Sequence, residues 1–531
     1  MSPSYPLDDI YQMIYAFQED FGLWILLFAV IFGFVLSFAV GANDSANSWG
    51  TPVGSGTVSF GVAVFFGALM ETLGALVLSA GVVNTVAGSS SVVNMELYRS
   101  DNESEWNNFK AGQPYMEGEK ELMLGMLSSM LASQVWQLAA TYLSWPVSGT
   151  HAIISSLLGF TLVQNGAEGV RIGEANPFCA SGIYKVVYGL FISSFVALFV
   201  GLALYYNLYK YAISSGKARS AKNRVWFSSC VFVMFLCIGF SLSTAKSLTK
   251  HIPSIIESDS CMDWNKTLFG FLVGLTTGAA VALPFHFLIL DRLLNSTTEF
   301  RLSFKLFNFL IKEQQTENVP LEKIGSLNNM TSSKIVLDGE SLESLDEPSE
   351  IKAVFRPLQF VVACFAALNH GGNDVGNCIG PLVTVWFLYR QPLAYDSSST
   401  SYIWLAWGGL GISLGLLMFG KRVIMTMGSK ITPMTPSLGF IVVLSASLVV
   451  MLCSFLGIPT STTHCQVMAV VGGGIARGMI DTNSVAGGFK TVDMKVFRNI
   501  GLSWIVTIPA SMAISAGLYA VLRISIIGPF S

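Results

Sequence analysis

The chain has 531 residues, of which 52% are hydrophobic and only 12% are charged, and its mean hydropathy is +0.57. A soluble protein of this size carries roughly a quarter charged residues, so the composition excludes an ordinary soluble protein. The net charge of −3 says little by itself. The eight cysteines show neither Cys-x-x-Cys nor Cys/His metal-ligand spacing, so we expect no cofactor site and no disulfide framework.

Apolar runs of about 20 residues, long enough to cross hydrocarbon, recur along almost the whole chain. They lie near 22–42, 58–83, 122–145, 150–164, 184–206, 225–245, 268–290, 354–369, 403–420, 437–458, 463–480 and 499–525. We therefore predict an all-α polytopic membrane protein with about 12 membrane segments. Segment 1–21 is acidic and lacks Lys and Arg, which is the wrong polarity for a cleaved signal peptide, so the first span is expected to be an uncleaved anchor.

The distribution of basic residues predicts the orientation. Five Lys or Arg and no acid lie in 207–225, and three lie in 420–432, so both loops should be cytoplasmic. The acidic N-terminus and the 84–121 loop should then face outside, where Asn102, in Asn-Glu-Ser, would be a glycosylation site. Cys179 and Cys261 would also lie outside, where they could form a disulfide only if the fold brings them close together.

The number of crossings agrees with this orientation if residues at about 122–164 form a re-entrant hairpin, which enters the membrane and returns to the same side. The repeated motif described below predicts a second hairpin at about 437–480. The two halves of the chain then run antiparallel, as an inverted-topology repeat. The expected order is an extracellular N-terminus (1–21), repeat 1 (22–206), two connecting transmembrane helices (207–290), a flexible cytoplasmic loop (291–352) and repeat 2 (353–531).

One motif occurs in both halves: GANDSANSWG at 41–50 and GGNDVGNCIG at 371–380. It places Asp44 and Asp374 beside apolar spans, where a charge costs at least about 2.5–3.5 kcal/mol. A bound cation would offset this cost. The four flanking asparagines offer hard oxygen ligands suited to Na⁺, beside carbonyls freed where a helix breaks: Asn43, Asn47, Asn373 and Asn377. The alternatives are a structural ion pair with Lys or Arg, and asparagines that only cap broken helices.

A second motif is PVSGTH at 146–151, which recurs as PTSTTH at 459–464. Proline followed by Ser and Thr is typical of a helix start, and a helix N-terminus inside a membrane is a ready anion site. We therefore predict an anion site formed by these two helix starts and their flanking hydroxyls, at 146–151 and 459–464. Capping alone remains the alternative for the hydroxyls. Two aspartates and a phosphate-like anion would carry a net charge of −3 or lower, so anion binding should require cations.

These paired motifs closely resemble the inorganic phosphate transporter (PiT) family of sodium–phosphate symporters. The resemblance covers about 22–290 and 354–525 and includes the stretches 58–75, 135–151, 420–440 and 497–509. It implies twelve membrane segments in an inverted repeat, plasma-membrane location and two Na⁺ per phosphate. Carried over by position, it implies that the phosphate ligands are Ser148, Gly149, Thr150, Ser461, Thr462 and Thr463, with help from Asp44 and Asp374. It also implies supporting roles in transport for Glu71, Gln137, His151 and His464. The chain departs from the family pattern at Ser45, where Val is usual, and at Val443, where vertebrate relatives tend to carry Glu.

The leading hypothesis is a secondary active symporter that imports phosphate with Na⁺ by alternating access. A proton-coupled phosphate symporter and a phosphate sensor or surface receptor without transport remain open. We expect no ATP-driven pump, because no Gly-x-x-x-x-Gly-Lys-Ser/Thr occurs, and no enzyme, because duplicated motifs do not supply an asymmetric nucleophile and base. The expected partners are phosphate, Na⁺ (co-transported, with no cofactor), membrane lipid and possibly a second copy of the chain, and no nucleic acid.

Overall fold

The computed structural model of the chain is almost entirely helical where it is described. Apart from a few isolated positions, the described residues are 7–87, 91–98, 115–175, 181–213, 220–243, 264–294, 347–391, 402–429, 434–456 and 458–529. The predicted glycosylation site Asn102, the cysteines 179 and 261 and most of the segment 291–352 lie outside them, so those predictions stay open.

The first half of the chain forms helices that match the expected apolar segments. Their bounds are α1 (Leu7–Phe17), α2 (Leu23–Asp44), α3 (Ala46–Gly54), α4 (Phe60–Leu78), α5 (Ala80–Ala87), α7 (Glu117–Tyr142), α8 (Gly149–Asn165), α9 (Gly182–Val187) and α10 (Ser193–Leu208). A π-helical segment, Gln18–Gly22, joins α1 to α2. Residues 7–22 are therefore helical, although the first helix was predicted to begin near residue 22.

The second half follows the same pattern. Its helices are α11 (Ala221–Ser243), α13 (Trp264–Pro284), α14 (Leu290–Leu294), α17 (Ser349–Arg390), α18 (Tyr402–Ser429), α19 (Pro436–Phe455), α20 (Thr462–Asp481), α21 (Val485–Gly488) and α22 (Met494–Ile526). One short antiparallel pair, β1 (Val336–Leu337) and β2 (Glu340–Ser341), is also described. Within the described residues, nine helices are long and apolar enough to cross a membrane. The chain is therefore a multi-pass membrane protein, and the full twelve-segment inverted repeat remains a prediction.

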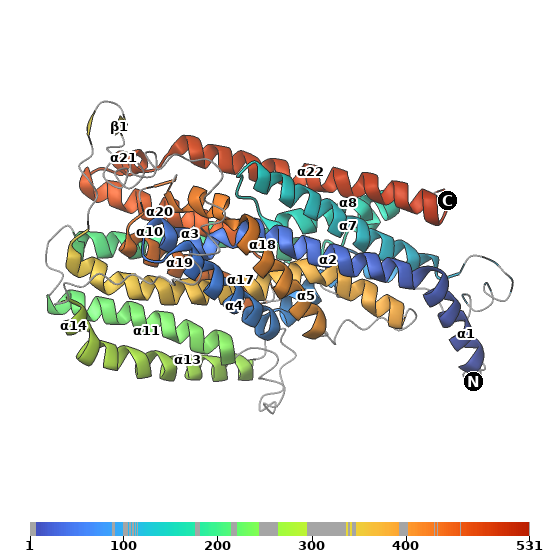
Figure 1. Cartoon of the computed structure of the whole chain (residues 1–531), viewed down its shortest axis with the longest axis horizontal. Helices are drawn as coiled ribbons and strands as arrows, with labels where there is room; N and C mark the ends of the chain where they lie inside the picture. Colours follow the sequence, from blue (N-terminus) through green and yellow to red (C-terminus); the bar gives the residue numbers. More distant parts are fainter. Residues whose placement is uncertain are drawn as a thin grey trace.

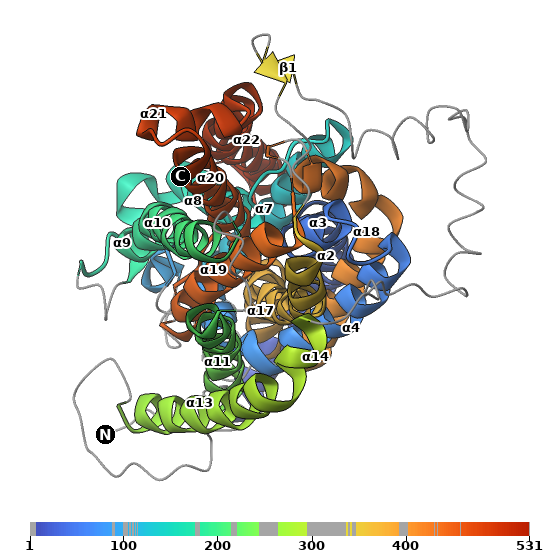
Figure 2. The ribbon, with the colours of Figure 1, turned by 90° about the vertical axis from the view of Figure 1, so that its left-hand side faces the viewer.

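Two helix pairs, α7–α8 and α19–α20, correspond to the predicted re-entrant hairpins and are called the first and second hairpin below. The first hairpin lies toward the end of the molecule where both chain termini lie, and the second lies toward the opposite end, near α14 and α21 (Figure 1). Helices α11 and α13 pack side by side at the periphery (Figures 1 and 2). The two hairpins thus approach the middle of the bundle from opposite ends.

The helix starts predicted from the two proline motifs are confirmed. Ser148 is the N-cap of α8 and its side chain accepts a hydrogen bond from the backbone N–H of His151. Ser461 caps α20 in the same way, with His464 as donor. Each cap satisfies one of the amides that a helix start leaves without a partner.

Helices α4 and α17 pack backbone to backbone, and this contact positions part of the site. A Cβ atom at Gly74 would lie 1.9 Å from the carbonyl oxygen of Leu368, and one at Gly371 would lie 2.0 Å from the carbonyl oxygen of Glu71. Only glycine permits such an approach. The glycines of the second Asn-Asp motif therefore bring α17 against the part of α4 that carries Glu71.

Candidate functional site

The two Asn-Asp motifs adopt different backbones. The first lies at a junction, because α2 ends at Asp44 and α3 begins at Ala46, with only Ser45 between them. The second lies inside α17, which is unbroken from Ser349 to Arg390. The predicted helix break at 371–380 is therefore wrong, and the expected end of that span near residue 369 is wrong for the same reason. The glycines there serve close packing rather than unwinding.

Both aspartates are buried, with 1% of each residue exposed, and each carboxylate contacts both hairpins. The Asp44 Oδ2 atom accepts from the Gly149 N–H at 3.0 Å, and its Oδ1 atom accepts from the Thr463 hydroxyl at 3.3 Å. The Asp374 Oδ2 atom accepts from the Thr462 hydroxyl at 3.1 Å, and its Oδ1 atom accepts from the Thr150 hydroxyl at 3.4 Å. The sequence motifs thus converge on one site.

The first asparagine of each motif, which precedes the aspartate, forms hydrogen bonds with the hairpin of its own half. Asn43 accepts from the Val147 N–H at 3.1 Å and donates to the Trp145 carbonyl at 2.9 Å. Asn373 donates to the Thr460 carbonyl at 2.9 Å. Both tips are therefore attached to their motifs through side-chain amides.

The second asparagine of each motif, three residues after the aspartate, donates a hydrogen bond to the hairpin of the other half. Asn47 donates to the Thr463 hydroxyl at 2.9 Å, and Asn377 donates to the Thr150 hydroxyl at 2.9 Å. Thr463 in turn donates to the Val147 carbonyl at 3.1 Å. Thr150 donates to the Thr460 carbonyl at 3.0 Å. These four hydrogen bonds correspond in the two copies, so for Asn47, Asn377, Thr150 and Thr463 the repetition in the sequence is also a repetition of contacts.

Several buried polar atoms at the site have no hydrogen-bond partner among the described residues. Neither amide atom of Gln137 has one, nor do the carbonyl oxygens of Asn373 and Asn377. The Gln137 Nε2 atom lies beside Gly149, since a Cβ there would be 3.1 Å from it. Because buried polar groups are nearly always hydrogen-bonded, such atoms indicate ligands. An amide N–H suits an anion, and amide oxygens suit Na⁺.

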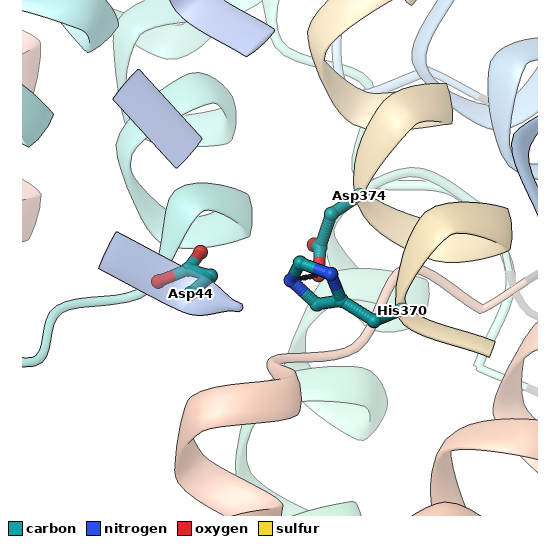
Figure 3. Close-up of side chains that lie close together, drawn as sticks. All are labelled: Asp44, His370 and Asp374. Atoms are coloured by element: carbon teal, nitrogen blue, oxygen red, sulfur yellow. Dashed lines mark ion pairs between the residues drawn. The ribbon is translucent and has the colours of Figure 1, made fainter. Parts of the chain in front are cut away.

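Sequence analysis missed His370. Its Nε2 atom lies 3.0 Å from Asp374 Oδ2, and its Nδ1 atom lies 3.2 Å from Glu71 Oε1. Figure 3 shows its ring beside the Asp374 carboxylate, with Asp44 opposite. One ligand atom from each of Asp44, His370 and Asp374 lies within 4.8 Å of the others. The sequence could have indicated it through the spacing of His370 and Asp374, because residues four positions apart lie on the same face of a helix.

The remaining predicted residues surround this centre. Glu71 is fully buried and accepts from the Ser45 hydroxyl at 3.0 Å. The rings of His151 and His464 contact each other, with centroids 4.3 Å apart. Within the described residues, neither aspartate pairs with Lys or Arg. The structural ion pair considered as an alternative therefore does not occur with those residue types, and histidine is the partner instead.

Comparison with known proteins agrees with this site. The sequence profile of the phosphate transporter family matches residues 40–515. Sodium-dependent phosphate transporter 1-A of Danio rerio is 28% identical, with 94% of each chain covered. The chloroplastic inorganic phosphate transporter 2-1 of Arabidopsis thaliana is 31% identical, covering 92% of this chain and 70% of that protein.

A solved structure described as the sodium-dependent phosphate transporter has the same fold, with a TM-score of 0.66 and 26% identity. The match covers 94% of this chain and 99% of that one. A phosphate permease of Haemophilus influenzae, itself named only by inference, is 28% identical over 95% of this chain and 98% of its own length. Family profile, relatives and fold agree, and the chain belongs to the phosphate transporter family, whose members are membrane transporters and not enzymes.

Proposed function

We propose that this protein imports inorganic phosphate across the plasma membrane together with Na⁺, two Na⁺ per phosphate, by alternating access. The observation that carries the proposal is the convergence of two buried carboxylates with the starts of two helices. Asp44 and Asp374 each bond groups from both hairpin tips. One buried site thus combines preferred ligands for a hard cation with preferred ligands for an oxyanion.

The charge balance supports cation coupling. The two aspartates contribute −2 and phosphate contributes at least −1. If His370 were protonated and Glu71 ionised, these two would cancel. The loaded site would then carry −3 without cations and −1 with two Na⁺. Because like charges in a medium of low polarity repel strongly, phosphate binding should be weak unless Na⁺ is bound.

The phosphate ligands that we propose come from the hairpin tips. The Gly149 N–H and the hydroxyls of Thr150, Thr462 and Thr463 now donate to the carboxylates. When Na⁺ occupies the carboxylate oxygens, these donors become available to phosphate. Gln137 adds an amide N–H that has no partner now. Ser148 and Ser461 cap their helices, which orients the backbone amides toward the same point.

The Na⁺ ligands that we propose are the two carboxylates and the amide oxygens of the four motif asparagines. The carbonyl oxygens of Asn373 and Asn377 have no donor among the described residues, so they can ligate a cation without losing a hydrogen bond. The Asn43 oxygen is already bonded to the Val147 N–H and would be shared. Alternating access follows from the hairpins, because they approach the site from opposite ends of the molecule (Figure 1).

The test is phosphate uptake into proteoliposomes that contain the purified protein. We expect saturable uptake that disappears when Na⁺ is replaced by choline at constant pH. Uptake that persists in choline and depends on an imposed pH gradient would instead show proton coupling. The observation that favours this alternative is the imidazole of His370, which lies between the carboxylates of Glu71 and Asp374. Radiolabelled phosphate counterflow separates both from a sensor, which would show none. The ratio of Na⁺ to phosphate flux tests the stoichiometry, and surface labelling of intact cells tests the location.

A further inference from the structure

We propose that Trp504 of α22 is a positioning residue that holds the two hairpin tips at the separation that phosphate binding requires. The inference rests on the proposed function, because it assigns Trp504 a role in the affinity of that site. Trp504 was not among the residues that the sequence motifs indicated. It comes from a third element that belongs to neither hairpin.

Trp504 contacts both tips with different parts of its side chain. Its indole Nε1–H donates to the carbonyl oxygen of Pro146, at the tip of the first hairpin, at 3.3 Å. Its ring lies against the His464 ring of the second hairpin, with centroids 3.7 Å apart and planes inclined by 34°. A single rigid side chain with two rotatable bonds therefore connects the two tips.

These two contacts flank a hydroxyl that we assign to the phosphate site. Pro146 precedes Val147, whose carbonyl accepts from the Thr463 hydroxyl at 3.1 Å. His464 follows Thr463 directly in the sequence. The same hydroxyl also donates to Asp44 at 3.3 Å. A change in the distance between Pro146 and His464 therefore displaces Thr463 relative to Asp44.

His464 is itself held on its other sides. Its Nδ1 atom lies 2.5 Å from the Ser461 hydroxyl, and its ring lies against that of His151 in the first hairpin. The three rings of Trp504, His464 and His151 thus form a row that joins α22, α20 and α8. Removing the first ring leaves the position of His464 less restricted.

Helix α22 is attached to the first hairpin independently of Trp504. Trp136 of α7 donates from Nε1 to the Thr507 hydroxyl at 2.9 Å, and Gly159 of α8 packs against the backbone of Met512, since a Cβ there would lie 2.3 Å from its carbonyl oxygen. These contacts fix α22 to the first hairpin. The Trp504 side chain therefore connects α22 and the first hairpin to the second hairpin. Substitution of Trp504 should therefore loosen the second tip without detaching α22.

The experiment compares Trp504→Leu and Trp504→Phe with the parent in phosphate uptake at saturating Na⁺. A displacement of about 1 Å at a binding site costs about 100-fold, so looser tips should raise the Michaelis constant for phosphate by at least about tenfold in Trp504→Leu. The maximal rate per correctly inserted protein should stay within about twofold of the parent, as expected when the lost binding is equal in the ground state and the transition state. Trp504→Phe keeps a ring against His464 and should lie between the two.

Trp407 of α18 supplies a matched control. Its Nε1–H also donates to a backbone carbonyl of another helix, that of Val30, at 3.0 Å. Its ring also contacts another ring, Phe34, with centroids 4.8 Å apart, but it touches neither tip. Trp407→Leu should leave the Michaelis constant unchanged.

Several outcomes would overturn the proposal. One is a fall in maximal rate with an unchanged Michaelis constant in Trp504→Leu, which is what a purely structural role predicts. Another is an equal rise in the Trp407→Leu control. If Trp504→Leu does not transport, the dissociation constant of inorganic phosphate, measured by calorimetry on purified protein in Na⁺, decides, and an unchanged value refutes the role. Failure of the proposed function is distinguishable, since the parent itself would then show no Na⁺-dependent uptake.

Discussion

The substitution Gly149→Ala tests how closely the first hairpin tip fits the cation site. A Cβ atom at this position would lie 2.9 Å from Asp44 Oδ2, 3.1 Å from Gln137 Nε2 and 3.1 Å from Val40 Cγ2. Ordinary contacts of this kind begin near 3.4 Å, so the tip or the carboxylate must move by about 0.5 Å to relieve the 2.9 Å contact. Asp44 also accepts from the Gly149 N–H at 3.0 Å, so the same movement strains that bond.

The magnitude follows from this displacement. A misplacement of about 1 Å costs about 100-fold, or roughly 2.7 kcal/mol, and half of that is about 1.4 kcal/mol, which corresponds to about tenfold. We therefore expect Gly149→Ala to lower phosphate uptake at subsaturating Na⁺ about tenfold in proteoliposomes. The control is Gly517→Ala on α22, where a Cβ would meet nothing within 4 Å. Uptake within twofold of the parent in Gly149→Ala, or an equal fall in the control, would refute the reasoning.

Three further predictions concern the charge at the site and the packing around it. Asp44→Asn and Asp374→Asn should abolish Na⁺-dependent uptake while protein still reaches the membrane, and normal uptake in either would remove that residue from the cation site. Gly74→Ala places a Cβ 1.9 Å from the backbone carbonyl of Leu368, so overpacking should cost about 3 kcal/mol or more and folded protein should be lost on size-exclusion chromatography. Burial raises the pKa of Glu347, so the melting temperature should fall as pH rises from about 5 to 8, and this fall should be smaller in Glu347→Gln.

The helix starts could be predicted from sequence because their signal is local. Proline with Ser and Thr specifies a helix N-terminus through its own backbone and side chains, and the caps at Ser148 and Ser461 form within three residues of each hydroxyl. The convergence of the two tips was predictable only from the repetition of the motifs. Repetition implies symmetry, and symmetry brings equivalent elements to one axis.

The helix break expected at 371–380 failed because glycine has two uses in a helix. Its conformational freedom favours a break, but its small size also allows two helices to touch. Gly371 serves the second use, against the backbone of Glu71. The sequence alone does not reveal which neighbour approaches. His370 was missed for the same reason. Its place in the site depends on its contact with Glu71, a residue almost 300 positions away on another helix.

The two halves of the site are equivalent in their motifs but not in their chemistry. The residue of the first half that corresponds to His370, at the offset of 330 between the Asn-Asp motifs, is Val40, so only the Asp374 side carries an imidazole on its own helix. The Ser461 hydroxyl lies within hydrogen-bond distance of His464 Nδ1, whereas the Nδ1 atom of His151 has no hydrogen-bond partner among the described residues. The histidine ring of the second tip therefore engages its capping serine, and the ring of the first tip does not. In the function that we propose, the two tips would thus offer phosphate unequal hydroxyl groups although their motifs are repeated.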